Sequence, residues 1–259
     1  MKITENIFMA VKNLRNNKAR SFLTMLGIII GVGAVITMVS LGEGAKRQIT
    51  QQISQMGSNL IMVTPGRNGT DSINNDIVTL LQESVDHVRA IAPVVRGSEL
   101  AEAQDNSMDT AVIGCTPEYA AIRNYQVAFG QFIGTEDYKD RRKVAVIGAE
   151  LAAELYPGIN PIGETIKVDG VRLEIIGILA QKGQGGFDNA DNVVMLPLTT
   201  AQDRIFGNKN ISEISLEVTD AAMVNETYNR VREVLLEELE DEDLYHVNNM
   251  AEMLSAAQN

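Results

Sequence analysis

An uncharged run of 21 residues, SFLTMLGIIIGVGAVITMVSL from Ser21 to Leu41, constrains this chain more than any other feature. As an α-helix the run is about 31 Å long, which matches the hydrocarbon thickness of a lipid bilayer. A single segment in lipid must satisfy its own backbone hydrogen bonds, so it has to be helical there. The run therefore predicts a membrane span. The helical spacing of Ile49, Ile53 and Met56 predicts that the helix continues as a stalk, so we assign residues 21–56 to span and stalk.

The charges on the two sides of the span differ and predict its orientation. Residues 1–20 carry five basic side chains and one acid, whereas the remainder of the chain carries 17 basic and 33 acidic residues. Because basic residues beside a span stay in the cytoplasm, we expect a cytoplasmic N-terminus and a main domain outside the membrane. The apolar spacing within residues 1–20 is typical of an amphipathic helix at the lipid surface. Such an acidic exterior argues against nucleic acid as a partner.

A cleaved signal peptide is the alternative interpretation of residues 1–42. Ser40 and Gly42 could form a small-x-small cleavage site behind a basic leader. However, the apolar run is longer than the roughly 7–15 residues usual for a signal peptide. The sequence therefore favours a retained membrane anchor.

Two segments outside the span share one order of elements. Residues 57–116 read as a strand at 59–64, a helix that begins at Thr79 and is stopped before Pro93, and then two further strands. Residues 211–259 read as strand, amphipathic helix and strand. We therefore predict an α+β fold in which these two segments pack together.

Residues 117–210 have a different texture, with short strands broken by glycine and proline. Asp169-Gly170 between two strand-like runs is a strong signal for a type I′ hairpin. We predict that this segment forms a small α/β lobe inserted between the two outer segments.

No motif in the sequence predicts catalysis, a metal site or a bound cofactor. The run at 65–70 lacks P-loop spacing, and the glycine-rich loop at 181–192 lacks both dinucleotide-binding and calcium-loop spacing. The two histidines, His87 and His246, are far apart in sequence, and the single cysteine, Cys115, reads as a buried apolar residue. Binding, adaptor or force-transmitting work is therefore the expected class of function.

Two sets of residues are candidates for contacts with other proteins. Gly27 and Gly31 form a G-x-x-x-G within the span, which predicts close packing against another helix. The glycine-rich loop is the predicted partner-contact region, through the side chains of Lys182, Gln184, Phe187 and Asp188.

Several segments, in this order along nearly the whole chain, resemble those of MacB-type ABC transporter permeases (the MacB/FtsX-like family). They are NLRNNKARSFLTMLGIIIGV at 13–32, SLGEGA at 40–45, SNLI at 58–61, GQFI at 130–133, RKVAVIG at 142–148, NPIG at 160–163, VRLEIIGIL at 171–179 and NVVMLP at 192–197. The resemblance implies a first transmembrane helix followed by an extracytoplasmic core domain with a porter-like part and an inserted lobe, sometimes called Sabre. It also implies three further membrane helices, so we expect this sequence to be part of a longer permease.

The resemblance carries expectations about function as well. Such permeases are homodimers in the bacterial cytoplasmic (inner) membrane, and they export peptides, macrolides or lipoproteins. ATP is bound by an ABC ATPase subunit or domain, so no cofactor is expected in this chain, and many members work with a membrane fusion (adaptor) protein. Two other classes stay open from the residues alone: a single-pass anchored sensor or binding module, and a secreted hydrolase with a cleaved signal.

Overall fold

A computed structural model describes residues 8–9, 18–56, 59–69, 71–182, 189–250 and 252–253, with 48–56 as backbone only. The chain divides into two compact units, Met1–Gln48 and Ile49–Asn259. Most of the interfacial helix predicted within residues 1–20 lies outside the described residues.

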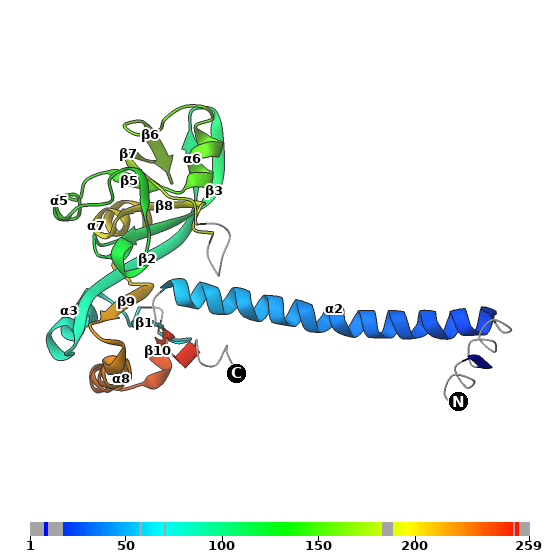
Figure 1. The fold of residues 1–259 in the computed structure, drawn as a ribbon. Helices are drawn as coiled ribbons and strands as arrows, with labels where there is room; N and C mark the ends of the chain where they lie inside the picture. Colours follow the sequence, from blue (N-terminus) through cyan, green and yellow to red (C-terminus); the bar gives the residue numbers. More distant parts are fainter. Residues whose placement is uncertain are drawn as a thin grey trace. The chain divides into compact units, whose positions relative to one another are not determined.

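The helix α2, Lys18–Met56, is one uninterrupted α-helix of 39 residues (Figure 1). The consecutive side chains of Ile28, Ile29 and Ile30 are each more than 60% exposed, so apolar surface faces several directions around the helix. The hydroxyl of Thr37 donates to the carbonyl of Gly33 at 2.8 Å, which satisfies it within the helix. Lys18–Arg47 is the one helix among the described residues that is long and apolar enough to cross a membrane.

The second unit is built on a mixed sheet whose strands run in the order β10-β1-β9-β2-β3-β8-β5-β7-β4, with β6 paired to β2 and β7. The pairs β3–β8 and β5–β7 are parallel and the others are antiparallel. The strands are β1 Leu60–Pro65, β2 Val88–Ala103, β3 Asn106–Cys115, β4 Val127–Gly130, β5 Val144–Ile147, β6 Thr165–Val168, β7 Val171–Leu179, β8 Val193–Pro197, β9 Glu213–Val218 and β10 Tyr245–Asn249.

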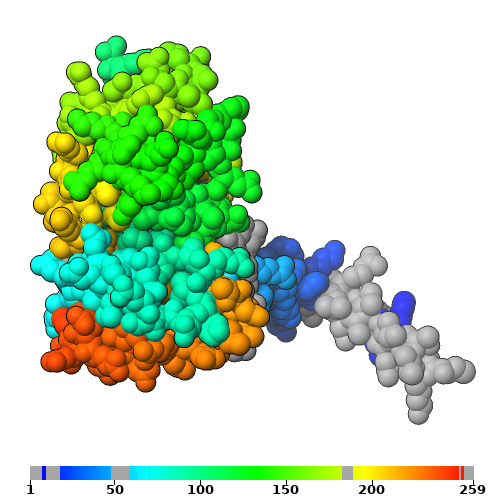
Figure 2. All heavy atoms as spheres, turned by 90° about the vertical axis from the view of Figure 1, so that its left-hand side faces the viewer, coloured from blue at the N-terminus to red at the C-terminus, as the bar shows by residue number. Residues whose placement is uncertain are grey.

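Strand order separates the parts of the sequence within this unit. The strand β1 lies between β9 and β10, and β9 pairs with β2, so residues 57–116 and 211–259 share one half of the sheet. From residues 117–210, the strands β8, β5, β7 and β4 follow beyond β3, and β6 pairs with both β2 and β7. In Figure 2 the cyan, orange and red residues gather at one end of this unit, and most green and yellow residues at the other. The assignment of residues 117–210 as a separate lobe stays a prediction.

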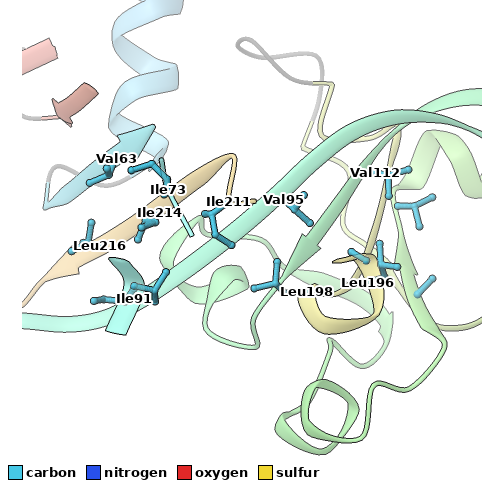
Figure 3. Packing of buried hydrophobic residues seen from close by; sticks show 14 of the residues in the cluster. Val63, Ile73, Ile91, Val95, Val112, Leu196, Leu198, Ile211, Ile214 and Leu216 are labelled. Carbon is cyan, nitrogen blue, oxygen red and sulfur yellow. The ribbon is translucent and has the colours of Figure 1, made fainter. Parts of the chain in front are cut away.

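The sheet buries both of its faces, which the alternation along its strands explains. In β1, Ile61 and Val63 point into the larger hydrophobic core, whereas Leu60 points into a smaller core on the opposite face. Side chains of the larger core run without a break along the sheet, through the residues labelled in Figure 3 (Val63, Ile73, Ile91, Val95, Val112, Leu196, Leu198, Ile211, Ile214 and Leu216).

Helices close the two cores. The helices α3, Asn75–Ser84, and α8, Val224–Leu239, contribute apolar side chains such as Leu81 and Leu235 to the larger core. The short helix α4, Tyr119–Ile122, contributes Tyr119 and Ile122 to the smaller core. The remaining helices are α5 Thr135–Lys139, α6 Ala149–Leu155, α7 Leu198–Thr200, the π-helix η1 Ala201–Phe206 and the 3-10 helices η2 Ala221–Met223 and η3 Glu242–Leu244.

The hairpin predicted at Asp169-Gly170 is confirmed. Both residues have positive φ, 44° and 77°, as a type I′ turn requires, and Val168 pairs with Val171 across the turn. The start predicted for the helix α3, at Thr79, is wrong. The helix begins at Asn75, and Asn74 caps it by accepting from the amides of Asp76 and Ile77.

The prediction that Pro93 stops this helix is also wrong. Pro93 lies inside β2, opposite Ile214 of β9. Proline has no N–H to donate, but β2 pairs with β3 only from Val94 onward, so Pro93 stands where one side of β2 is still an edge. The sequence rule that proline ends a strand or helix therefore fails here for a local reason.

The position of the α3 cap can be tested by substitution. We expect Asn74→Ala to lower the free energy of unfolding by about 1 kcal/mol, because two amides at the helix start lose their acceptor. Thr79→Ala, at the cap that the sequence predicts, should cost less, since the Thr79 hydroxyl bonds only to the carbonyl of Asn75 within the helix. Denaturant unfolding of the two variants measures the difference, and a larger loss at Thr79 would contradict the observed start of α3.

Candidate functional site

A group of charged and aromatic side chains lies over the smaller core, where the two halves of the sheet meet. It consists of Arg96 on β2, Tyr119 on α4, Arg123 directly after α4, Lys182 after β7 and Glu213 on β9, and we call these five residues the charge cluster. Its members come from all three parts of the sequence. The cluster therefore ties residues 117–210 to the two outer segments.

Glu213 is the centre of the cluster. Its side chain is 7% exposed, and its carboxylate lies 3.4 Å from the guanidinium of Arg96 and 3.9 Å from that of Arg123. The hydroxyl of the fully buried Ser215 donates to the same carboxylate at 2.6 Å. Burying a charge is costly unless it is paired and hydrogen-bonded, and these three partners supply that compensation.

Arg123 has fewer oxygen contacts than its burial would lead one to expect. Its side chain is 10% exposed, and the hydrogen bond of its guanidinium among the described residues goes to the sulfur of Met62 at 3.4 Å. Burial acts to lower the pKa of Arg123, but Glu213 and then Tyr119 raise it, and the net direction is upward. Arg123 therefore stays charged in this position.

Tyrosine rings support the cations. The hydroxyl of Tyr119 accepts from the guanidinium of Arg96 at 2.7 Å, and the Tyr119 ring stacks on that of Tyr125 at 5.9 Å between centroids. The ammonium of Lys182 lies 4.4 Å from the centre of the Tyr125 ring, within the range of a cation–π interaction. Burial raises the pKa of the Tyr119 hydroxyl, so it stays protonated.

Lys182 is fixed at both its backbone and its side chain. The ammonium donates to the carbonyl of Arg123 at 2.9 Å, and the Lys182 amide donates to the carboxylate of Asp191 at 2.8 Å. Burial lowers the pKa of Lys182, and the nearby Arg123 lowers it further. The bond between Lys182 and Asp191 brings together the two ends of the glycine-rich segment predicted to contact a partner.

Asp191 also joins this segment to a helix. It is 4% exposed, and its carbonyl accepts from the amides of Glu150 and Leu151 at the start of α6. Gly148, just before α6, has to be glycine, because a Cβ there would come within 2.2 Å of the Asp191 carbonyl oxygen. Of the predicted contact residues, Lys182 alone is described, and Gln184, Phe187 and Asp188 lie outside the described residues.

The two glycines predicted for helix packing lie one turn apart on α2. A Cβ added at Gly27 or Gly31 would meet no atom within 4 Å, so this face is open to a neighbouring helix. Among the described residues, no helix covers the pair.

The other candidates from the sequence are placed as follows. Cys115 is fully buried in the smaller core, which confirms its assignment as a packing residue, and burial raises the pKa of its thiol. His87 adopts a positive φ of 64° in the turn before β2, and His246 lies on β10. No three His, Cys, Asp or Glu side chains in the described part of the chain come together as a metal site.

The charge cluster was not predicted from the sequence. Glu213, Ser215 and Glu217 alternate along β9, and a polar face of this kind usually faces solvent. Here α4 covers the Glu213 end of that face, and α4 was not predicted. Arg96, Arg123 and Glu213 are far apart in the sequence, and only the topology of the sheet brings them together.

The comparisons with known proteins identify the class to which this fold belongs. The family described as "MacB-like periplasmic core domain" matches residues 21–234. The chain is 32% identical to the "Macrolide export ATP-binding/permease protein MacB" of Bdellovibrio bacteriovorus, covering 97% of this chain and 41% of that protein. The protein of the same name from an Azoarcus species is 34% identical, covering 96% of this chain and 39% of its own length. The chain belongs to the MacB-like periplasmic core domain family, and it spans about two fifths of the length of these relatives.

Two crystal structures have a similar fold. The periplasmic region of MacB from Actinobacillus actinomycetemcomitans superposes with a TM-score of 0.69 at 16% identity, covering 82% of this chain and 98% of that one. The extracellular domain of the noncanonic ABC-type transporter YknZ from Gram-positive bacteria gives a TM-score of 0.63 at 18% identity, covering 74% and 100%. At these identities the likeness concerns the fold alone.

The contribution of the charge cluster to stability can be measured at Glu213. We expect Glu213→Gln to lower the free energy of unfolding by about 3 kcal/mol, because two arginines that are mostly buried lose their shared carboxylate. Glu217→Gln on the same strand is the matched control and should cost less than about 1 kcal/mol, since its partner Arg89 is 60% exposed. If denaturant unfolding gave the same loss of free energy for both variants, the charge cluster would contribute no more to stability than a surface ion pair.

Proposed function

We propose that this chain is the part of a MacB-like ABC exporter that carries the first transmembrane helix and the extracytoplasmic core domain. The observation that carries the proposal is the family match over residues 21–234, which begins inside the apolar helix α2 and extends into α8. The N-terminus would lie in the cytoplasm and the second unit outside the bacterial cytoplasmic (inner) membrane, in line with the basic residues before the span.

In this proposal the chain transmits motion and does no chemistry of its own. A partner ABC ATPase subunit or domain would bind and hydrolyse ATP, and the permease would work as a homodimer. The continuous α2 would carry the movement outward, because a helix without a proline or break resists bending. The name of the relatives, which includes macrolide export, supports export as the activity. A peptide, macrolide or lipoprotein as cargo and a membrane fusion (adaptor) protein as partner are what the resemblance to MacB-type permeases implies.

The finer assignments belong to the same proposal. Residues 57–116 and 211–259 would form the porter-like part, with 117–210 as the inserted Sabre-like lobe. The strand pairing supports this division, because β1 lies between β9 and β10 while β4, β5, β7 and β8 lie together at the other side of the sheet. Lys182 and the residues that follow it would contact the adaptor.

The coupling can be tested in right-side-out membrane vesicles that hold the complete transporter. The exposed Lys209 is replaced by cysteine as a reporter, and the fully buried Cys115 should give little background. We expect an impermeant maleimide added outside to label the reporter, and the labelling rate to change when ATP and vanadate are trapped inside. A partner ATPase without its catalytic carboxylate is the control. Labelling that is independent of trapped nucleotide would contradict coupling, and labelling only from the inside would contradict the orientation.

The packing role of the span is tested by Gly31→Leu. A leucine on the open Gly27/Gly31 face should prevent a neighbouring helix from approaching closely, and we expect a severalfold lower yield of assembled permease on native gels. Gly33→Leu is the matched control, because residue 33 points to a different side of the helix. Unchanged assembly of the Gly31 variant would rule out packing through this face.

A further inference from the structure

We infer that the charge cluster is a docking site for one carboxylate side chain of a partner protein, held by Arg123 and Lys182. Two of its cations, Arg96 and Arg123, form ion pairs with Glu213. The inference stands on the contacts of these side chains and does not depend on the proposed transport function.

Arg123 is the first reason for this assignment. A guanidinium has five N–H donors, and in the interior these are normally met by oxygen acceptors. The guanidinium of Arg123 donates to no oxygen among the described residues, although nine tenths of its side chain is buried. Its closest ion-pair distance, 3.9 Å to Glu213, is longer than a hydrogen bond. The side chain thus retains donors for an acceptor from outside.

Lys182 supplies a second cation beside the first. It is exposed, and its ammonium donates to the backbone carbonyl of Arg123. The ammonium has three donors, and the carbonyl uses one of them. The Tyr125 ring beneath it fixes its position without using a further donor. A carboxylate could therefore accept from Lys182 and Arg123 together.

The charges favour a carboxylate over a phosphate. Beyond residue 20 the chain has 33 acidic and 17 basic residues, and this excess repels a dianion more than a monoanion. Glu213 lies 3.9 Å from the Arg123 guanidinium and adds to that repulsion. A monocarboxylate with two oxygens matches the planar fork of Arg123. The fitting partner is therefore an aspartate or glutamate side chain on a protein surface.

The test uses the 259-residue chain in detergent micelles, labelled with ¹⁵N at arginine and lysine. The peptide acetyl-Ala-Glu-Ala-amide is added, and the Nε–Hε resonance of Arg123 is followed by NMR. We expect a saturable shift with the glutamate peptide and none with acetyl-Ala-Gln-Ala-amide, which has the same shape without the charge. An equal shift with the glutamine peptide would overturn the inference, and so would tighter binding of inorganic phosphate.

Variants locate the site within the chain. Lys182→Gln should weaken binding of the glutamate peptide about tenfold, as expected for the loss of one hydrogen bond to a charged group. Because Lys182 is exposed, this variant should fold even where Arg123→Gln does not. Lys167→Gln, a surface lysine paired with Glu102, is the control and should leave binding unchanged. Full binding by the Lys182 variant would overturn the inference, and so would an equal loss in the Lys167 control.

Discussion

The pairing of β2 on both of its edges is the constraint on which the second unit depends. This strand pairs with β9 from Val88 to Val94 and with β3 from Val94 to Ala103, so it passes from one half of the sheet to the other (Figure 1). Val94 is the residue where both pairings meet, and its partner on β9 is Glu213. The next residue on the same face of β2 is Arg96. The charge cluster therefore forms at Glu213, the first residue of β9, beyond which this edge of β2 has no strand until Ala101.

Contacts other than strand pairing surround β2 directly beyond Val94. The Arg96 amide donates to the hydroxyl of Ser212 at 3.0 Å, and a ring edge of Phe206 covers Gly97, where a Cβ would come within 2.4 Å of it. Only at Ala101 does β2 gain another strand, β6. A buried ion pair is seldom more stable than apolar packing, but its geometry is more demanding. We propose that the cluster serves here to fix how the two halves of the sheet meet, which a purely apolar contact would leave less defined.

The sequence predicts the parts of this structure that local patterns specify. The uncharged run predicts α2, Asp169-Gly170 predicts its hairpin, and short apolar runs bounded by turn residues predict most strands. It fails where several weak signals compete, as at the start of α3, where Asn74 and Thr79 are both able to cap a helix. It also misses α4, β4 and α5, whose four or five residues are too short to show a period. The charge cluster was beyond reach for another reason, because its residues are separated by up to 117 positions and only pairing over that distance joins them.

The acidic surface and the cationic cluster together restrict which partners can bind at this place. At long range the excess of acidic residues repels an acidic protein, so a partner rich in carboxylates would approach slowly. At short range the field of Arg123 and Lys182 dominates, because these cations lie within a few ångströms of a docked group and Arg123 is largely shielded from solvent. Both conditions are met by a neutral or basic surface that presents one acidic side chain. The combination thus favours a partner that places one carboxylate at the right position, and a high net negative charge alone does not lead to binding.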